Sequence, residues 1–302
     1  MSSSLKHNEV ANWQSLRCRG IYHYNGIQNI NRLFPNSFAA GMVFSLICRQ
    51  SILKFGFIGV EDPVTAEGNI TVSSLAQSLG RPNETVRRQI SKIEAQGYIV
   101  RHGNNIEIDI NGSKSQNIRV FIQKTYNDFL EYIELLIRAD DMLPGNGVNF
   151  QADSIKRKIL ETALDIYIVP MATHVGTFKE WTYGNVWTGI AVDSIRHIEQ
   201  SDCLSKTYRF INTPDEMRRA VSLRSVAKKM NLSYPTAWRA AQYLKEANLI
   251  VQSTDGWNVT SQNLQARSMP HADRTYFQYL GRQLRQLIVL GFDPKMAQSY
   301  KV

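Results

Sequence analysis

Side chains that form strong hydrogen bonds gather in one stretch of this 302-residue chain. They carry amide, hydroxyl or charged head groups, and they are Asn83, Glu84, Thr85, Arg87, Arg88, Lys92 and Arg101. Asn and Arg can each form two parallel hydrogen bonds with a planar partner, and Arg and Lys bind phosphate oxygens. The residue types therefore indicate recognition of a polar or anionic surface.

Two helices must position these side chains, within SLAQSLGRPNETVRRQISKIEAQGYIV at 74–100. Thr71 and Ser73 are suitable N-caps for a first, short helix, which Gly80 ends. A second helix is predicted from Glu84 to Gln96, with Gly97 at its C-terminal cap. Residues at helical spacing form the predicted buried stripes: Leu75, Ala76 and Leu79 in the first helix, and Val86, Ile90 and Ile93 in the second.

A β-hairpin is predicted directly after the second helix. Residues 98–100 suit a strand, residues 101–105 a hairpin tip, and Ile106, Ile108 and Ile110 alternate with polar residues as a return strand would. Pro82 precedes the second helix, so Asn83 is expected to cap it.

Helix, turn, helix and hairpin in this order form a winged helix-turn-helix, and the stretch resembles the DNA-binding unit of GntR- and MarR-type bacterial regulators. The residues that carry the resemblance are Leu75, Ala76, Leu79, Gly80, Thr85, Val86, Arg87, Arg88, Ile90, Ile93, Glu94, Gly97, Tyr98 and Ile99. The resemblance implies that the second helix enters the major groove of DNA. On the outward face of this helix, Arg87 is assigned to bases and Arg88 to phosphate. Lys92 of the helix, and Arg101 and His102 of the hairpin, are also assigned to phosphates.

A related stretch recurs 151 residues later, at residues 225–251, without a gap. Identical residues at this offset are Ser225, Ala227, Thr236, Arg239, Ile250 and Val251. A second hairpin is predicted to turn at residues 254–256. The sequence therefore predicts an internal duplication.

The second stretch presents a different outward face: Ser233, Tyr234, Thr236, Trp238, Arg239 and Gln242. Its first helix adds positive charge at Arg224, Lys228 and Lys229. Trp238 replaces Arg87, and two roles stay open for it. It either contacts thymine methyl groups or sugars, or it lies buried in a protein–protein contact.

The predicted fold class is mainly α with small β-wings (α+β), with two tandem winged helix-turn-helix units flanked by further helices. The predicted division is an N-terminal arm at 1–35, a first unit at 36–147 and a second unit at 148–302, with a turn-rich seam at 143–147. Helices are expected before each unit, at 38–51 and 189–202. Long helices near 118–139 and 272–291 are expected to pair and fix the distance between the units.

Composition favours a nucleic-acid partner. The formal charge is +9, with a net +2 in residues 1–151 and +7 in residues 152–302, and a basic protein attracts polyanions. Three separated cysteines and six scattered histidines predict neither a disulfide framework nor a metal site. No cofactor, catalytic motif, signal peptide or membrane span is expected, and the predicted location is cytoplasmic and nucleoid-associated.

The favoured function is a transcriptional regulator that binds double-stranded DNA as an intramolecular pseudo-dimer. The alternatives are a plasmid-type replication initiator with tandem winged helices and a protein-docking or assembly factor, because exposed arginines also occur on solvated or protein-binding faces. Self-association stays open, and so does a small-molecule effector. An aromatic cluster suits either an effector pocket or plain packing: Phe178, Trp181, Tyr183 and Trp187.

Overall fold

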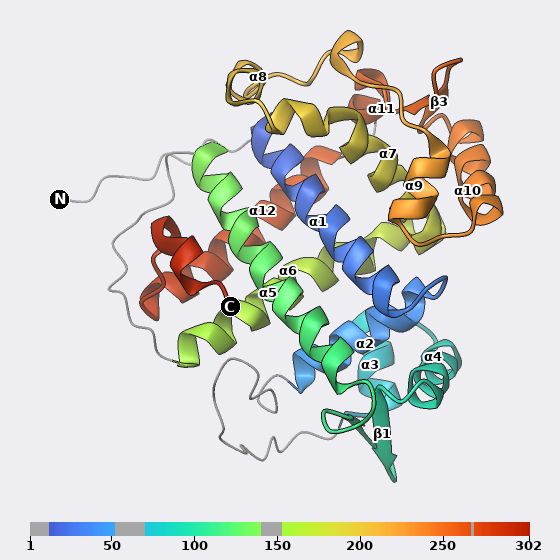
Figure 1. The fold of residues 1–302 in the computed structure, drawn as a ribbon, viewed down its shortest axis with the longest axis vertical. Helices are drawn as coiled ribbons and strands as arrows, with labels where there is room; N and C mark the ends of the chain where they lie inside the picture. The colour runs from blue at the N-terminus through green and yellow to red at the C-terminus, as the bar shows by residue number, and fades with distance from the viewer. Residues whose placement is uncertain (1–11, 52–69, 140–152, 267–268) are drawn as a thin grey trace.

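The computed structural model describes residues 12–51, 70–139, 153–266 and 269–302 (Figure 1). These residues are mainly helical, with two short antiparallel hairpins, as predicted. The first half contains α1 (Trp13–Leu33), α2 (Phe38–Gln50), α3 (Val72–Leu79), α4 (Asn83–Ala95), β1 (Ile99–His102), β2 (Asn105–Ile108) and α5 (Ser115–Ala139). The predicted seam at 143–147 lies outside the described residues.

The second half begins with two long helices and ends with a long helix and a 3₁₀ turn. Its elements are α6 (Asp153–Phe178), α7 (Trp181–Glu199), α8 (Asp202–Thr207), η3 (Asp215–Met217), α9 (Leu223–Lys229), α10 (Tyr234–Glu246), β3 (Val251–Gln252), β4 (Trp257–Asn258), α11 (Ser261–Ala266), α12 (Met269–Val289) and η4 (Pro294–Tyr300). The helices predicted before each unit are present as α2 and α7.

Helix α1 lies in the middle of the molecule, packed between α5 and α7 (Figure 1). Its N-terminus is capped by Asn12, whose side chain accepts a hydrogen bond from the N–H of Ser15 at 2.7 Å. Polar residues of α1 are buried beside apolar ones: Gln14, Arg17, His23, Asn29 and Asn31. The predicted arm at 1–35 therefore differs from the structure over 13–33, because that segment is a buried helix.

A buried ion pair joins α1 to the end of α7. The Arg17 guanidinium binds the Glu199 carboxylate, and their side chains are only 4% and 5% exposed. Arg17 also donates to the carbonyl of Tyr208 at 2.8 Å, and Glu199 accepts from the hydroxyl of Ser205 at 2.8 Å. These additional hydrogen bonds satisfy both charges, which a buried pair requires to be tolerated.

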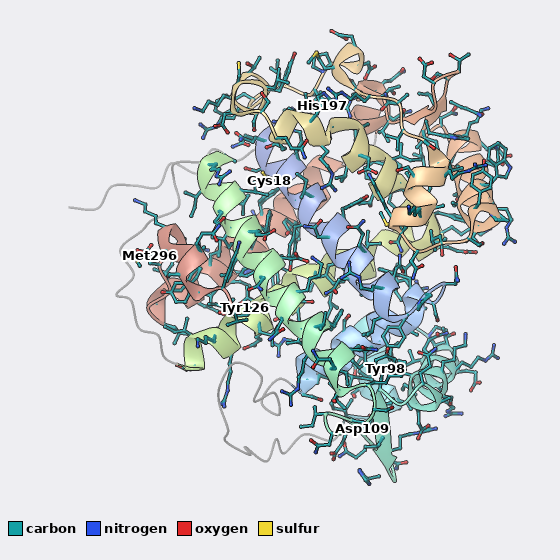
Figure 2. All side chains as sticks on the ribbon, viewed as in Figure 1. Cys18, Tyr98, Asp109, Tyr126, His197 and Met296 are labelled. Carbon is teal, nitrogen blue, oxygen red and sulfur yellow. The ribbon has the colours of Figure 1, made fainter. Side chains whose placement is uncertain are left out.

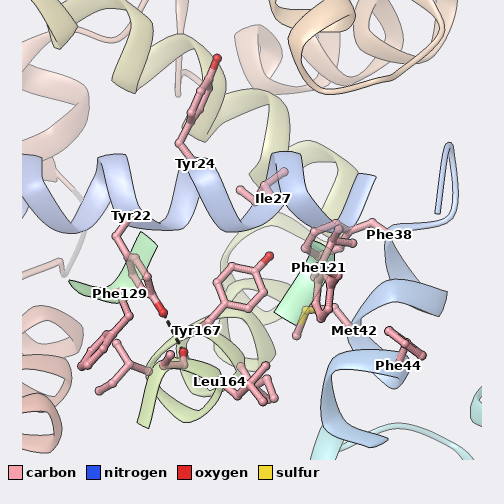
Figure 3. Close-up of a cluster of buried hydrophobic side chains, with 14 of the residues drawn as sticks. Tyr22, Tyr24, Ile27, Phe38, Met42, Phe44, Phe121, Phe129, Leu164 and Tyr167 are labelled. Atoms are coloured by element: carbon pink, nitrogen blue, oxygen red, sulfur yellow. Dashed lines mark hydrogen bonds between the residues drawn. The ribbon is translucent and has the colours of Figure 1, made fainter. Parts of the chain in front are cut away.

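Aromatic rings fill the space between α1 and its neighbours (Figure 3). The ring of Tyr22 stacks on Tyr132 of α5 with centroids 4.9 Å apart, and its hydroxyl donates to the carbonyl of Ala163 in α6 at 2.7 Å. Tyr24 points from the opposite side of α1 (Figure 3), and Arg196 of α7 lies 4.8 Å from its ring centroid. One helix of the first half thus packs against two helices of the second.

Helices α5 and α12 confirm the predicted long helices but not their pairing. α5 packs against α1, α6 and η4, whereas α12 packs mainly against α6. The contact between α5 and α12 includes one hydrogen bond, from the hydroxyl of Tyr276 to that of Tyr132 at 3.3 Å. Helices α1 and α6 each contact both α5 and α12, so the two long helices do not form the predicted pair.

Candidate nucleic-acid interface

The first unit, residues 70–109, begins with the short helix α3. Thr71 caps it in a reciprocal arrangement, in which the hydroxyl of Thr71 accepts from the N–H of Ser74 and that of Ser74 accepts from the N–H of Thr71. Ser73, the other predicted cap, lies inside the helix. Gly80 ends α3 with a φ of +58°, a left-handed conformation that glycine adopts at little cost.

Helix α4 begins at Asn83, one residue before the predicted start. The expectation that Asn83 caps it is wrong. Pro82 occupies the cap position, and no side chain caps the helix there. The predicted buried stripe is confirmed for all three residues, Val86, Ile90 and Ile93.

The first hairpin is present, but its turn is shorter than predicted, because Arg101, His102 and Asn105 belong to the strands and β2 ends before Ile110. β1 and β2 pair from Ile99 with Ile108 to His102 with Asn105, so Gly103 and Asn104 form the turn. The N–H of Ile106 also donates to the carbonyl of Ile70 at 2.9 Å, which fixes the hairpin to the chain before α3.

Every predicted site residue of α4 is exposed: Asn83, Glu84, Thr85, Arg87, Arg88 and Lys92. Glu84 lies between two arginines, 3.3 Å from Arg87 Nη1 and 3.3 Å from Arg88 Nε. The side chains of Arg87 and Arg88 are 61% and 73% exposed. Ion pairs this exposed contribute little to stability, so the guanidinium groups can exchange Glu84 for another partner.

Arg101 on the wing is also exposed but is engaged by α4. It forms an ion pair with Glu94, which lowers the pKa of Glu94 and raises that of Arg101 through their hydrogen bond. This contact ties the wing to the C-terminal half of α4. A role for Arg101 in phosphate binding therefore requires exchange of this partner.

The second unit, residues 221–259, contains the same elements in the same order: α9, α10, β3 and β4. Helix α10 spans residues 234–246, the range of α4 shifted by 151. The turn after α9 is closed by a bond from the N–H of Leu232 to the carbonyl of Ala227 at 2.9 Å. At the same offset, the N–H of Arg81 bonds the carbonyl of Ala76 at 2.9 Å.

Left-handed residues also recur at this offset. Gly80 and Gly97 have φ of +58° and +76°, and Asn231 and Asn248 have +50° and +54°. Asn tolerates this conformation better than other non-glycine residues. The backbone therefore turns at corresponding positions in both units, although glycine occurs in only one.

The two wings are anchored alike. Trp257 pairs with Val221, its N–H donating to the carbonyl at 2.9 Å, as Ile106 does with Ile70. Lys245 of α10 bonds the side chain of Gln252 on the wing at 2.9 Å, at the positions that Glu94 and Arg101 occupy in the first unit. Both wings are thus joined to the preceding helix by one side-chain contact.

The outward face of α10 is aromatic where that of α4 is polar. Ser233 caps the helix, its hydroxyl accepting from the N–H of Thr236 at 3.3 Å. Tyr234 and Trp238 are 43% and 39% exposed, so Trp238 is not buried within this chain. Arg239 is exposed, whereas Thr236 and Gln242 are half-buried.

Lys229 is expected to offer an unpaired positive charge to DNA phosphates, but it forms an ion pair within the protein. Its ammonium group pairs with Asp193 of α7 at 2.8 Å, and Asp193 is largely buried. Lys228 is exposed, as expected. No local pattern identifies Asp193 as the partner of Lys229, because the two residues lie on different helices.

Each helix-turn-helix corner touches a helix of the other half. The guanidinium of Arg81, in the first corner, lies 4.7 Å from the ring centroid of Trp181 at the start of α7. In the second corner, the amide of Asn231 donates to the carbonyl of Asn31 in α1 at 2.9 Å. These contacts link each corner to the opposite half, and sequence reasoning missed them.

The aromatic cluster of α6 and α7 packs against neighbouring elements. Tyr183 stacks on Tyr243 of α10 with centroids 4.4 Å apart, and Phe178 lies 5.4 Å from Trp187. Trp181 contacts Phe38 of α2 with centroids 6.0 Å apart. The packing interpretation thus accounts for contacts of all four side chains.

Among the described residues, no group of three or more His, Cys, Asp or Glu side chains is arranged to hold a metal ion. Within the same part of the chain, none of the helices combines the length and apolar character needed to cross a membrane.

Comparison with protein families matches residues 61–109 to the DeoR-like helix-turn-helix domain. Comparison of the chain with curated proteins and with solved structures gives no match. The family match includes α3, α4, β1 and β2, and it leaves the narrower GntR or MarR assignment a prediction. It supports a winged helix-turn-helix DNA-binding regulator.

Proposed function

We propose that the protein is a sequence-specific transcriptional regulator that binds double-stranded DNA through α4 and α10 together. The observation that carries the proposal is the recurrence of one backbone geometry at a constant offset, each time with an exposed, arginine-bearing second helix. The DeoR-like match supports DNA binding by the first of them. Figure 1 shows α4 and α10 on the same side of the molecule.

We infer an internal duplication from the same observation. The left-handed residues and corner hydrogen bonds fall at equivalent positions, although few side chains are identical. The boundary between units near 147 and 148 is part of this proposal. Helix α1 belongs to the shared core rather than to an arm.

A single chain with two such units can act as a two-fold dimer does. Recognition helices that enter successive major grooves on one face of DNA are separated by roughly 34 Å, one helical turn. The contacts of Arg81 with Trp181 and of Asn231 with Asn31 hold each corner against the other half. A fixed separation favours one spacing between half-sites over others.

The proposed roles follow from position on the helices. Side chains near the N-terminus of each second helix meet base edges, whereas later residues and the wing meet phosphates. In the first unit Asn83, Glu84, Thr85 and Arg87 then face bases, and Arg88, Lys92 and Arg101 face phosphates. In the second unit Ser233, Tyr234, Thr236 and Trp238 face bases, and Arg239 and Gln242 face the sugar-phosphate backbone of the DNA.

Selection of bound sequences from random duplex DNA tests the proposal. The expected product contains two half-sites at one fixed spacing. Arg88→Ala and Arg239→Ala are each expected to weaken binding and to reduce the slope of log affinity against log salt by about 1. Arg285→Ala, an exposed arginine on α12 outside both units, is the matched control and should change neither.

Two outcomes contradict the proposal. A footprint confined to one half-site removes the pseudo-dimer. Unchanged affinity and salt slope in both arginine variants show that these helices do not contact DNA, and then favour a protein-docking role.

A further inference from the structure

Two positions on the recognition helices differ in chemistry between the units. Asn83 and Arg87 of α4 correspond, at the 151-residue offset, to Tyr234 and Trp238 of α10. All four side chains are exposed, and each pair lies one helical turn apart. Hydrogen-bonding groups in one unit are therefore replaced by aromatic rings in the other.

The aromatic pair is held in place by its surroundings. The ring of Trp238 meets the buried Trp257 edge-on, with centroids 5.9 Å apart and planes at 86°. The ring centroids of Tyr234 and Trp238 lie 6.2 Å apart, and Pro235 follows Tyr234 in the first turn of the helix. Side chains ordered before binding lose less conformational entropy when they bind.

Positive charge surrounds this pair. Residues 218–259 contain seven Lys or Arg and two Asp or Glu, whereas the equivalent residues 67–108 contain five and four. The guanidinium of Arg224 lies 5.8 Å from the ring centroid of Tyr234, and Lys228 and Arg239 are exposed nearby on α9 and α10. Residues 218–259 therefore carry a net charge of +5 around exposed aromatic rings. Such a surface suits a polyanion that also offers apolar groups.

Major-groove DNA offers one such group, the C5-methyl of thymine. Asn and Arg instead read the hydrogen-bonding edges of adenine and guanine. We propose that the protein reads two unlike half-sites: α4 reads purine edges by hydrogen bonds, and the Tyr234–Trp238 pair of α10 packs on thymine methyl groups. This inference rests on the proposed function, because it assumes that both helices enter DNA.

Replacing thymine by uracil in the selected duplex tests the inference, because it removes the methyl group and leaves base pairing unchanged. Each contacted methyl is expected to contribute about a threefold to fivefold loss of affinity when removed, from the cost of exposing one buried carbon. The loss should occur in the half-site that α10 covers. The same replacement in the half-site of α4 should have no effect.

Protein variants assign the effect to the aromatic pair. The double variant Tyr234→Ala/Trp238→Ala should bind the thymine and uracil duplexes equally. Trp238→Leu, which retains apolar surface, should keep more of the preference for thymine than Trp238→Ala. Arg87→Ala should instead relax the preference for purines in the other half-site and leave the uracil effect intact. Circular dichroism and thermal unfolding confirm that each variant is folded.

The outcomes separate the inference from the proposed function. If the protein binds a two-part duplex but uracil has no effect, or the double variant Tyr234→Ala/Trp238→Ala keeps the thymine preference, the inference is wrong and the proposed function stands. If no duplex is selected at all, both are wrong. A symmetric selected site also overturns the inference, because identical half-sites cannot suit such different faces.

Discussion

The two units have the same backbone turns but different interiors. In the first unit, Val86 and Ile90 of α4 fill the space below the helix, whereas α10 has Ala237 and Ala241 at those positions, all buried. Alanines let a helix lie closer to its support, and α10 also stacks Tyr243 on Tyr183 of α7. The turn residues thus define the helix-turn-helix backbone. Different sets of buried side chains can pack beneath its second helix.

The surfaces differ as well. The second unit carries a larger excess of positive charge and an aromatic face, and the first carries Asn, Glu and Arg. A homodimer must present identical surfaces from both subunits. Two units on one chain can each acquire their own specificity.

The largest expected effect tests whether the units share one core. Glu199→Ala leaves the Arg17 charge buried without its partner, so we expect a loss of about 3–5 kcal/mol in the free energy of unfolding. Because α1 joins both halves, a single cooperative unfolding transition should shift in denaturant. Two separate transitions, with only one displaced, would show that the units fold independently.

Arg49→Ala serves as the comparison for that prediction. Arg49 binds Asp165 and Glu161, but its side chain is 26% exposed, and water can replace its partners. We expect a clearly smaller loss of stability, since partly exposed ion pairs contribute less than buried ones.

A second pair of variants contrasts the interiors below α4 and α10. Ile90→Ala removes buried carbon from the first unit and should cost about 2–5 kcal/mol. Ala241→Ile adds volume where α10 packs closely and should cost about 1–3 kcal/mol. Hydrogen exchange should locate each loss in the altered unit. A neutral result for Ala241→Ile would mean that α10 has room beneath it.

The smallest expected effect is a pH dependence confined to one wing. The contact with Arg101 lowers the pKa of Glu94 in the folded protein, so its stabilising contribution is present above the unfolded pKa and is lost as pH falls through the lowered folded value. Below about pH 4 the first wing should open more often, measured as faster amide exchange at Arg101. The second wing, held by Lys245 and neutral Gln252, should not respond.

Glu94→Gln is the control for the pH experiment. It removes the titrating group, so the exchange rate at Arg101 should lose its additional acid dependence. Equal acid responses in both wings would contradict the assignment to Glu94.

The sequence was informative where local signals determine structure. Gly80 and Gly97 mark helix ends, and the spacing of Val86, Ile90 and Ile93 identifies the buried face of α4. These features depend on neighbours within a few residues. The exposed positions of the α4 site residues followed directly from that spacing.

The sequence was misleading where burial depends on distant partners. Helix α1 carries buried Gln14, Arg17 and Asn31, and polar residues of this kind usually indicate a solvated segment. Their partners lie elsewhere in the chain, such as Glu199 for Arg17. The pairing of Lys229 with Asp193 was missed for the same reason. No local pattern encodes such contacts.

The outer side of the molecule away from the two units also carries apolar residues, such as Met296, which is 40% exposed (Figure 2). Val289 and Leu290 at the end of α12 are exposed as well. Isolated exposed apolar residues are ordinary on protein surfaces.

The central place of α1 has a consequence for synthesis of the chain. During translation, α1 is synthesised first, and α7 is synthesised only after residues 34–180. Its buried Arg17 must wait for Glu199, at the end of α7. The first DNA-binding unit is therefore complete in sequence well before its support is, and a chain truncated before α7 is expected to require chaperones or to be degraded.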